Sequence, residues 1–227
     1  MERKFKFSID EFYHLYNRGI ERRTIFLDLK DKERFINLLF LCNGSKPLVF
    51  KDIPQGLPLW KVNRGEPLVA IGAYCLMPNH FHILVSEIIE NGISKFIWKL
   101  LTAYSMYFNK KYKRTGRLFE GTFRAEYVDK DEYLEYLFAY IHLNPIKLID
   151  PKWRENGVSN MIESKQFLKD YRYSSYSDYI GESRPETTIL NKSAFPEYFE
   201  SSKEFEDYVA DWLNYKDNFP QGLPLGK

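Results

Sequence analysis

Two apolar runs joined by a short turn constrain the fold of this chain most strongly. Residues 68–76 and 80–86 each read as a strand, and Met77, Pro78 and Asn79 between them form a turn, so a hairpin is predicted. The flanking elements are predicted as a strand over 12–18, a helix over 30–42, a helix over 92–109 and a strand over 117–128. This order is that of a split βαβ, ferredoxin-like α+β fold, an antiparallel sheet with helices packed on it.

A last helix is expected from about residue 130 to 144. Asp129 and Glu132 have the spacing of a capping box, and Pro145 disfavours helical angles in the residue before it. Gly121 is expected to kink the strand that precedes this helix.

Two segments lie outside this pattern. The sequence predicts a first domain over residues 1–180. Residues 43–67 are rich in glycine and proline and are predicted to form a long loop inserted in this domain. Residues 181–227 carry five basic and nine acidic residues and are predicted to be an acidic, partly helical C-terminal extension. A six-residue sequence, Pro-Gln-Gly-Leu-Pro-Leu, occurs at both 54–59 and 220–225. Two copies do not make a repeat architecture.

Composition excludes several classes of protein. The chain has 227 residues, of which 44% are hydrophobic and 28% charged, as in globular domains. It has no apolar run of roughly 18 residues, so no membrane span is expected. Residues 1–10 lack the apolar centre of a signal peptide. Cys42 and Cys75 are too few for a disulfide framework. A cytoplasmic protein is therefore expected.

Charge is distributed unevenly along the chain. Residues 91–124 hold eight basic residues and one acidic residue, although the whole chain has a net charge of only +2. A basic stretch inside a nearly neutral protein indicates a polyanion partner. The alternative is a solvated helix end, and charge alone does not separate the two.

Two histidines stand two residues apart in the second strand of the hairpin. Residues i and i+2 of a strand point to the same side, so His80 and His82 project together, while Phe81 and Ile83 point to the other side. Two adjacent imidazoles are a natural half of a metal site. The alternative is a pair of strand histidines that only form hydrogen bonds.

The last predicted helix can supply the other half of such a site. Tyr136, Tyr140 and Asn144 are four residues apart and form one stripe, next to an apolar stripe that would dock on the sheet. Asn144 offers an oxygen ligand, and two imidazoles with one amide oxygen leave coordination positions open for Mg²⁺ or Mn²⁺. An open cation can assist a phenol, whose usual pKa is about 10. The alternative interpretation of Tyr140 is an aromatic side chain of the hydrophobic core.

Several motifs in this chain, taken together and in order, resemble those of the single-tyrosine HUH transposases, in particular the REP-associated tyrosine transposases. Met77-Pro78-Asn79-His80-Phe81-His82 looks like the HUH motif, and the other matching segments are residues 13–19, 116–121, 140–145 and 174–176. The resemblance covers roughly residues 10–180. It implies the ferredoxin-like sheet already inferred, and a catalytic domain over residues 1–180.

The resemblance also implies roles for individual residues. His80 and His82 would be metal ligands, and Asn144 occupies the place of the third protein ligand, which is often glutamine in other branches. Tyr140 would be the nucleophile that attacks a DNA phosphate and gives a 5′-phosphotyrosine and a free 3′-hydroxyl. The expected cofactor is a divalent cation, Mg²⁺ or Mn²⁺.

The expected partner is single-stranded DNA beside a small hairpin. Cations can follow its phosphates and aromatic side chains can stack on unpaired bases. The candidate DNA-binding residues are Lys110, Lys111, Lys113, Arg114, Arg117 and Arg124. Whether the tyrosine acts in its own chain or on a partner's site stays open, so a homodimer is considered beside a monomer.

Two other functions are compatible with parts of the pattern. A histidine-motif nucleotide hydrolase would need a third alternating histidine, and position 84 is leucine. A non-catalytic module is the stronger alternative, because ferredoxin-like sheets with aromatic faces bind single-stranded nucleic acids. Such a module would need neither a metal nor a particular tyrosine.

Overall fold

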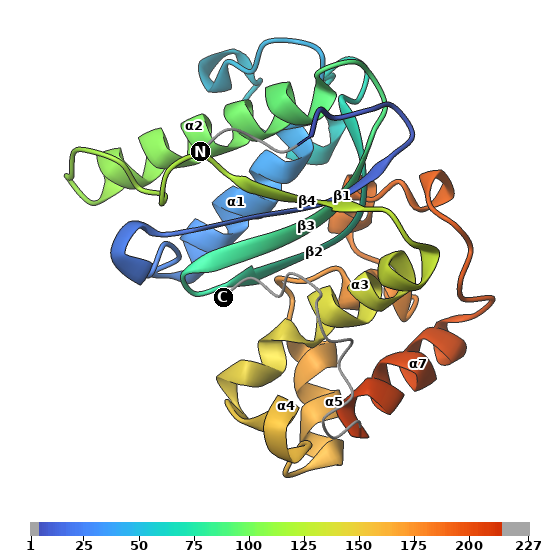
Figure 1. Ribbon diagram of the computed structural model, residues 1–227. Helices are drawn as coiled ribbons and strands as arrows, with labels where there is room; N and C mark the ends of the chain where they lie inside the picture. Colours follow the sequence, from blue (N-terminus) through green and yellow to red (C-terminus); the bar gives the residue numbers. More distant parts are fainter. Residues whose placement is uncertain (1–4, 215–227) are drawn as a thin grey trace.

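The protein is built around a four-stranded antiparallel sheet with strand order β2-β3-β1-β4 (Figure 1). The computed structural model describes residues 5–214. The strands are β1 (Phe12–Arg18), β2 (Val69–Met77), β3 (His80–Glu87) and β4 (Arg124–Val128). β3 lies between β1 and β2, the two strands that the first helix connects, which is the split βαβ arrangement. The predicted α+β sheet with helices packed on it is confirmed.

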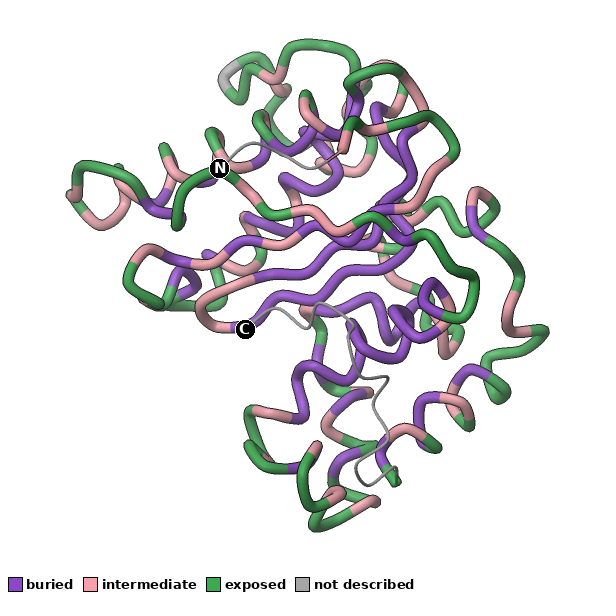
Figure 2. The backbone as a smooth tube through the Cα atoms, viewed as in Figure 1, coloured by how far each residue is buried: buried purple, intermediate pink, exposed green. Residues whose placement is uncertain are grey.

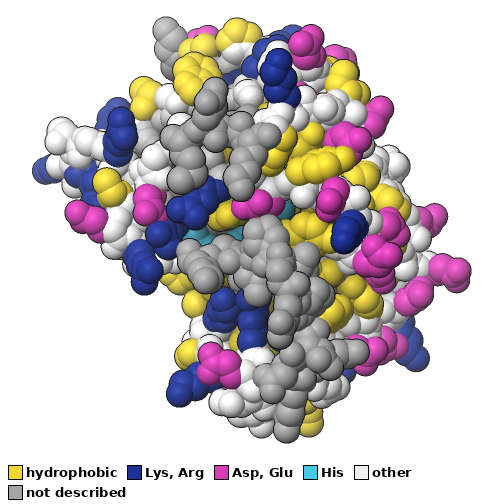
Figure 3. Space-filling view, in the orientation of Figure 1, with side chains coloured by type: hydrophobic (Ala, Val, Ile, Leu, Met, Phe, Trp, Pro, Cys, Tyr) yellow, Lys and Arg dark blue, Asp and Glu magenta, His cyan; other side chains and the backbone are white. Residues whose placement is uncertain are grey.

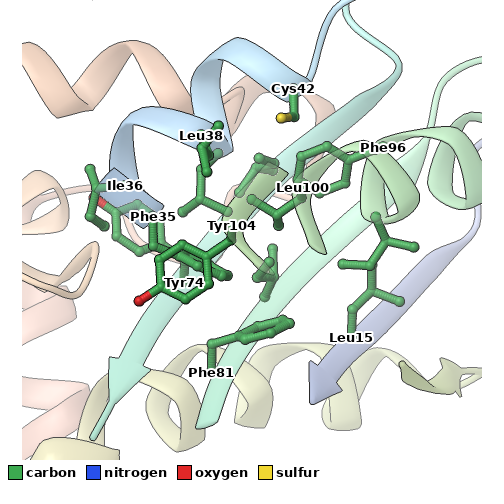
Figure 4. Packing of buried hydrophobic residues seen from close by; sticks show 14 of the residues in the cluster. Leu15, Phe35, Ile36, Leu38, Cys42, Tyr74, Phe81, Phe96, Leu100 and Tyr104 are labelled. Carbon is green, nitrogen blue, oxygen red and sulfur yellow. The ribbon is translucent and has the colours of Figure 1, made fainter. Parts of the chain in front are cut away.

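Helices α1 (Leu29–Cys42) and α2 (Gly92–Lys111) cover one face of this sheet. The main core lies between them and the strands, and Figure 4 shows Phe35 of α1, Tyr104 of α2 and Phe81 of β3 within it. Asp28 caps the N-terminus of α1, and its side chain accepts a hydrogen bond from the backbone N–H of Asp31. Such a cap satisfies one of the free N–H groups that every helix start exposes.

Helix α3 (Asp131–Leu143) packs on the opposite face of the sheet and is almost entirely buried (Figure 2). Apolar side chains of α3 contact small side chains of β2, so the helix lies close to the sheet. The helices that follow are α4 (Trp153–Asn156), α5 (Met161–Asp170), α6 (Tyr176–Tyr179) and α7 (Ser202–Asn214). No helix in residues 5–214 is both long and apolar enough to cross a membrane.

The described part of the C-terminal extension packs onto this second layer. Phe195 contacts Gly72 of β2 so closely that a Cβ atom at position 72 would come within 2.8 Å of its ring. The Trp212 ring of α7 lies 4.8 Å from that of Tyr136 in α3. The boundary at residue 180 stays a prediction, but side chains beyond it belong to the same packed layer. The second Pro-Gln-Gly-Leu-Pro-Leu copy lies outside the described residues.

Two local predictions were wrong. The strand predicted over 117–128 begins only at Arg124, because Gly121 adopts a φ of +70°, which breaks the extended chain. The residues before it are held by Leu118, whose carbonyl accepts from the backbone N–H of Ile20 at 2.9 Å. The cap of α3 is Lys130, with no side-chain hydrogen bond, so the capping box predicted at Asp129 does not form.

His142 of α3 makes the fold sensitive to acid. Its Nδ1 donates to the carbonyl of Phe138 at 2.7 Å, and its Nε2 accepts from the Ser175 hydroxyl at 2.7 Å. The side chain is fully buried, and burial lowers the pKa of His142 to about 3. The neutral ring therefore contributes its full stabilisation above a pH of about 6.5, the pKa of the residue in the unfolded chain. This stabilisation is lost as the pH falls toward 3.

We expect acidification from pH 7 to 4.5 to destabilise the protein by about 3 kcal/mol through His142 alone. His142→Gln, which cannot titrate, should reduce the difference in unfolding free energy between these two pH values by that amount. Chemical denaturation at both pH values measures it. An unchanged pH dependence in the variant would contradict this assignment.

Candidate active site

The sheet face under α3 gathers three of the four histidines. His80 and His82 lie on β3, and His14 and Tyr16 lie on the neighbouring strand β1. The strands pair so that His82 stands opposite Tyr16, with His14 one step along the same face. The His82 ring centroid is 5.0 Å from that of His80 and 5.0 Å from that of His14. The predicted pair on one side of the strand is confirmed, and a third imidazole joins it.

Hydrogen bonds use one nitrogen of each histidine in the pair. His82 Nδ1 lies 2.9 Å from Nε2 of His14, and His80 Nδ1 lies 2.6 Å from Oδ1 of Asn79. Ligating histidines commonly use one ring nitrogen for such a neighbour and the other for the metal. Nε2 of His80 and of His82 are therefore the atoms free to face a ligand.

Burial keeps these imidazoles neutral. Burial, together with the smaller effect of the charges of Lys147 and Arg18, lowers the pKa of His80 to about 4. Burial also places the pKa of His82 well below its usual range. Neutral imidazole is the form that binds metal ions, so both side chains are ready for that role at neutral pH.

Tyr140 of α3 stands over these rings. Its ring meets His82 edge-on at a centroid distance of 5.5 Å and His14 at 5.8 Å. The phenol is 2% exposed, and burial raises the pKa of Tyr140, against the opposing charge and hydrogen bond of Arg154. The Arg154 guanidinium lies 4.8 Å from the Tyr140 ring centroid. The Tyr140 ring thus contacts two imidazoles and a cation.

Asn144 follows Tyr140 by one turn, at the start of a short 3-10 helix (Asn144–Leu148). Its Nδ2 donates to the backbone carbonyl of Tyr140 at 2.7 Å, and the side chain is buried. This contact uses the amide nitrogen and leaves the amide oxygen as the atom able to bind a cation. The chain therefore brings both predicted histidines, the tyrosine and the asparagine into one region.

The residues fit a weakly held divalent cation better than a structural zinc. Among residues 5–214, no three His, Cys, Asp or Glu side chains are grouped to hold a metal ion. Two imidazoles and an amide oxygen carry no negative charge. A cation at this site would keep open positions for oxygen atoms of a ligand, as Mg²⁺ and Mn²⁺ do.

A cleft opens beside the histidines, at the end of β1 and the start of β3. Three arginines line it, two from around β1 and one from β4: Arg18, Arg22 and Arg124. Arg18 forms an ion pair with Glu120, whereas Arg22 and Arg124 are exposed. Figure 3 shows histidine surface next to a group of Lys and Arg side chains. The positive charge favours an anionic ligand such as a phosphate.

The other predicted DNA-binding cations differ in their surroundings. Lys110, Lys113 and Arg117 are exposed near the end of α2. The Lys111 ammonium instead contacts Asp28 and Asp31 at 2.7 Å each and fastens the end of α2 to the start of α1. Arg114 donates to Asn109 at 2.7 Å. These contacts favour a structural role for Lys111 and Arg114.

The sequence analysis did not predict four side chains of this site. His14 was visible in a predicted strand, but only the register of β1 against β3 shows that it meets His82. Arg18 and Arg22 flank the first turn and carry no spacing signal. Arg154 belongs to a helix of four residues, α4, which no periodicity predicts.

Fold and site together define a ferredoxin-like protein with an HUH-type histidine pair facing a helical tyrosine. Residues 65–144 match the family of IS200-like transposases. This segment contains the histidine pair, Tyr140 and Asn144. The family match supports a transposase-type function.

A solved structure has the same fold. It is described as the structure of a REP-associated tyrosine transposase bound to a REP hairpin, with 13% sequence identity and a TM-score of 0.50. The alignment covers 88% of this chain and 99% of that one. A search of curated proteins gave no match to this sequence. The predicted resemblance to transposases is confirmed over residues 65–144, and the solved structure confirms the fold.

Proposed function

We propose that the protein cuts and rejoins single-stranded DNA beside a hairpin and holds the cut end as a 5′-phosphotyrosine on Tyr140. The observation that carries this proposal is the packing of the Tyr140 ring against His82, 5.5 Å between centroids, with the Arg154 guanidinium 4.8 Å from the centroid of the same Tyr140 ring. A core tyrosine needs no such neighbours, whereas a nucleophilic phenol needs cations to stabilise its negative charge.

Each residue has a task in the proposed reaction. His80, His82 and the amide oxygen of Asn144 would hold Mg²⁺ or Mn²⁺, which when bound polarises a phosphate oxygen. Tyr140 Oη forms a bond to phosphorus while the bond from phosphorus to the 3′-oxygen breaks. The 3′-oxygen leaves with the electron pair and, in the net reaction, receives the phenol's proton. Attack by a 3′-hydroxyl on the phosphotyrosine reverses these steps and joins a strand.

Arg154 is proposed to assist the phenolate. Its hydrogen bond and charge lower the pKa of Tyr140, opposite to the larger effect of burial. A fixed cation stabilises a phenolate both as nucleophile and as leaving group. Because Tyr140 is 2% exposed and does not line the cleft, the proposal includes a movement of this side chain toward the DNA.

One chain is proposed to supply the whole site, since both histidines, the tyrosine and the asparagine come from the same chain. The proposal needs no second subunit, and the homodimer considered from the sequence stays untested. The acidic extension and the loop over 43–67 are assigned no catalytic part.

Cleavage of labelled hairpin DNA tests the proposal. The substrate is a small hairpin with single-stranded flanks taken from the borders of the protein's own gene. With Mn²⁺ present we expect a covalent protein–DNA adduct and a free strand ending in a 3′-hydroxyl, and with EDTA neither. Tight binding without any adduct, indifferent to EDTA, would instead support a non-catalytic single-strand-binding module.

The cleft arginines give a separate prediction for DNA binding. The double variant Arg22→Ala/Arg124→Ala should bind single-stranded DNA more weakly and reduce the slope of log affinity against log salt by about 1.4, the effect of two lost phosphate contacts. Lys165→Ala/Lys203→Ala, which removes two exposed cations from α5 and α7, is the matched control. Equal salt slopes in the two double variants would remove the cleft from the DNA-binding surface.

A further inference from the structure

The third histidine of the site is the group that the proposed reaction leaves unused. His14 is fully buried, and its ring stacks on His82 with an interplanar angle of 24°. Its Nε2 atom lies 2.9 Å from Nδ1 of His82. Nothing in the proposed reaction requires an imidazole at this position, and a buried polar side chain that only filled space would be unfavourable.

We infer that His14 is a positioning residue that accepts the Nδ1 proton of His82 when His82 binds a divalent cation through Nε2. This inference rests on the proposed metal role of His82. A neutral imidazole has one N–H, and only its other nitrogen can bind a metal. Since His82 binds through Nε2, its proton must be on Nδ1, where it donates to Nε2 of His14.

The same contact has a second possible direction. If His14 donates from Nε2, His82 accepts at Nδ1 and carries its own proton on Nε2, which blocks metal binding. His14 Nδ1 has no hydrogen-bond partner among the described residues, so no neighbouring group fixes the proton of His14 on either nitrogen. The two rings therefore have to change tautomer together, and a bound cation selects the arrangement in which His14 accepts.

The tautomer of His80 is fixed by a single hydrogen bond. Its Nδ1 lies 2.6 Å from Oδ1 of Asn79, an oxygen that can only accept, so the proton of His80 is held on Nδ1. The two ligands are thus oriented by different partners: an amide oxygen next in sequence and an imidazole on a neighbouring strand. Loss of His14 should weaken His82 as a ligand without touching His80.

Two substitutions at position 14 separate orientation from packing. His14→Phe keeps an aromatic ring in the buried space but offers no acceptor. His14→Gln offers an amide oxygen that can accept from His82 Nδ1. We expect the phenylalanine variant to bind Mn²⁺ about 10- to 100-fold more weakly, the usual effect of removing an outer hydrogen-bond partner of a metal ligand, and the glutamine variant to recover most of that loss.

The measurement is Mn²⁺ binding by calorimetry and electron paramagnetic resonance on the full chain without DNA, with unfolding temperature in EDTA as the control for folding. In the Mg²⁺-saturated wild type, the ¹⁵N signals of His82 should show the proton on Nδ1. Equal Mn²⁺ affinity in wild type and His14→Phe, or an equal loss in both variants, would overturn the role of His14. Failure of all proteins to bind Mn²⁺ would instead contradict the proposed metal site itself.

Discussion

Replacement of Tyr140 by phenylalanine is expected to abolish the covalent protein–DNA adduct completely. The variant loses only the phenolic oxygen, and the ring that packs against His82 and His14 stays in place. Without that oxygen no phosphotyrosine can form, whereas DNA binding, which depends on exposed cations, should change by less than about threefold. Denaturing gel electrophoresis of a labelled hairpin measures the adduct, and fluorescence anisotropy measures the binding.

A matched control lies one turn earlier on the same helix. Tyr136 is also buried, and its ring centroid is 6.0 Å from that of Tyr140. Tyr136→Phe should form the adduct at close to the wild-type rate. Adduct formation by Tyr140→Phe, or its loss only in Tyr136→Phe, would remove Tyr140 from the proposed role.

The second large effect is expected from the histidine pair. His80→Ala and His82→Ala should each reduce adduct formation by at least about 100-fold, since each removes one of only two imidazole ligands. His82 is 2% exposed and His80 is partly exposed, so His80→Ala separates loss of the ligand from loss of stability. The rate of adduct formation as a function of Mn²⁺ concentration measures both variants.

His142→Gln is the control for these substitutions, because His142 is buried away from the cleft and bonded to Ser175. Its adduct formation at neutral pH should match that of the wild type. A metal response unchanged in His80→Ala, or lost equally in His142→Gln, would mean that the cation acts elsewhere.

The central elements of the fold were predictable because their patterns are local. β1 has the predicted bounds, Phe12–Arg18, and β3 ends one residue beyond its prediction, at Glu87. Alternation and apolar runs identify such strands because the sheet buries them on one or both faces. The strand before α3 was predicted too long, since apolar Leu118 and Phe119 extend the alternation of Phe123, Ala125 and Tyr127 toward the N-terminus, although Gly121 turns the chain.

The site was predictable only where its residues share an element. His80 with His82, and Tyr140 with Asn144, have spacings that place each pair on one side of a strand or helix. The contact between the two pairs depends on how α3 packs on the sheet, and the contact with His14 on strand register. Arg154 comes near Tyr140 through a turn of the chain after residue 144, which no spacing in the sequence indicates.

The proposed reaction depends on a cation that is shared by the histidine pair and reached by Tyr140. X-ray diffraction from crystals soaked in Mn²⁺, recorded for the anomalous signal of manganese, tests this directly. We expect one strong peak within coordination distance of Nε2 of both His80 and His82, next to Asn144 and facing the arginine-lined cleft. A manganese peak that lies elsewhere, with both Nε2 atoms bound to other groups, would contradict the proposed metal site.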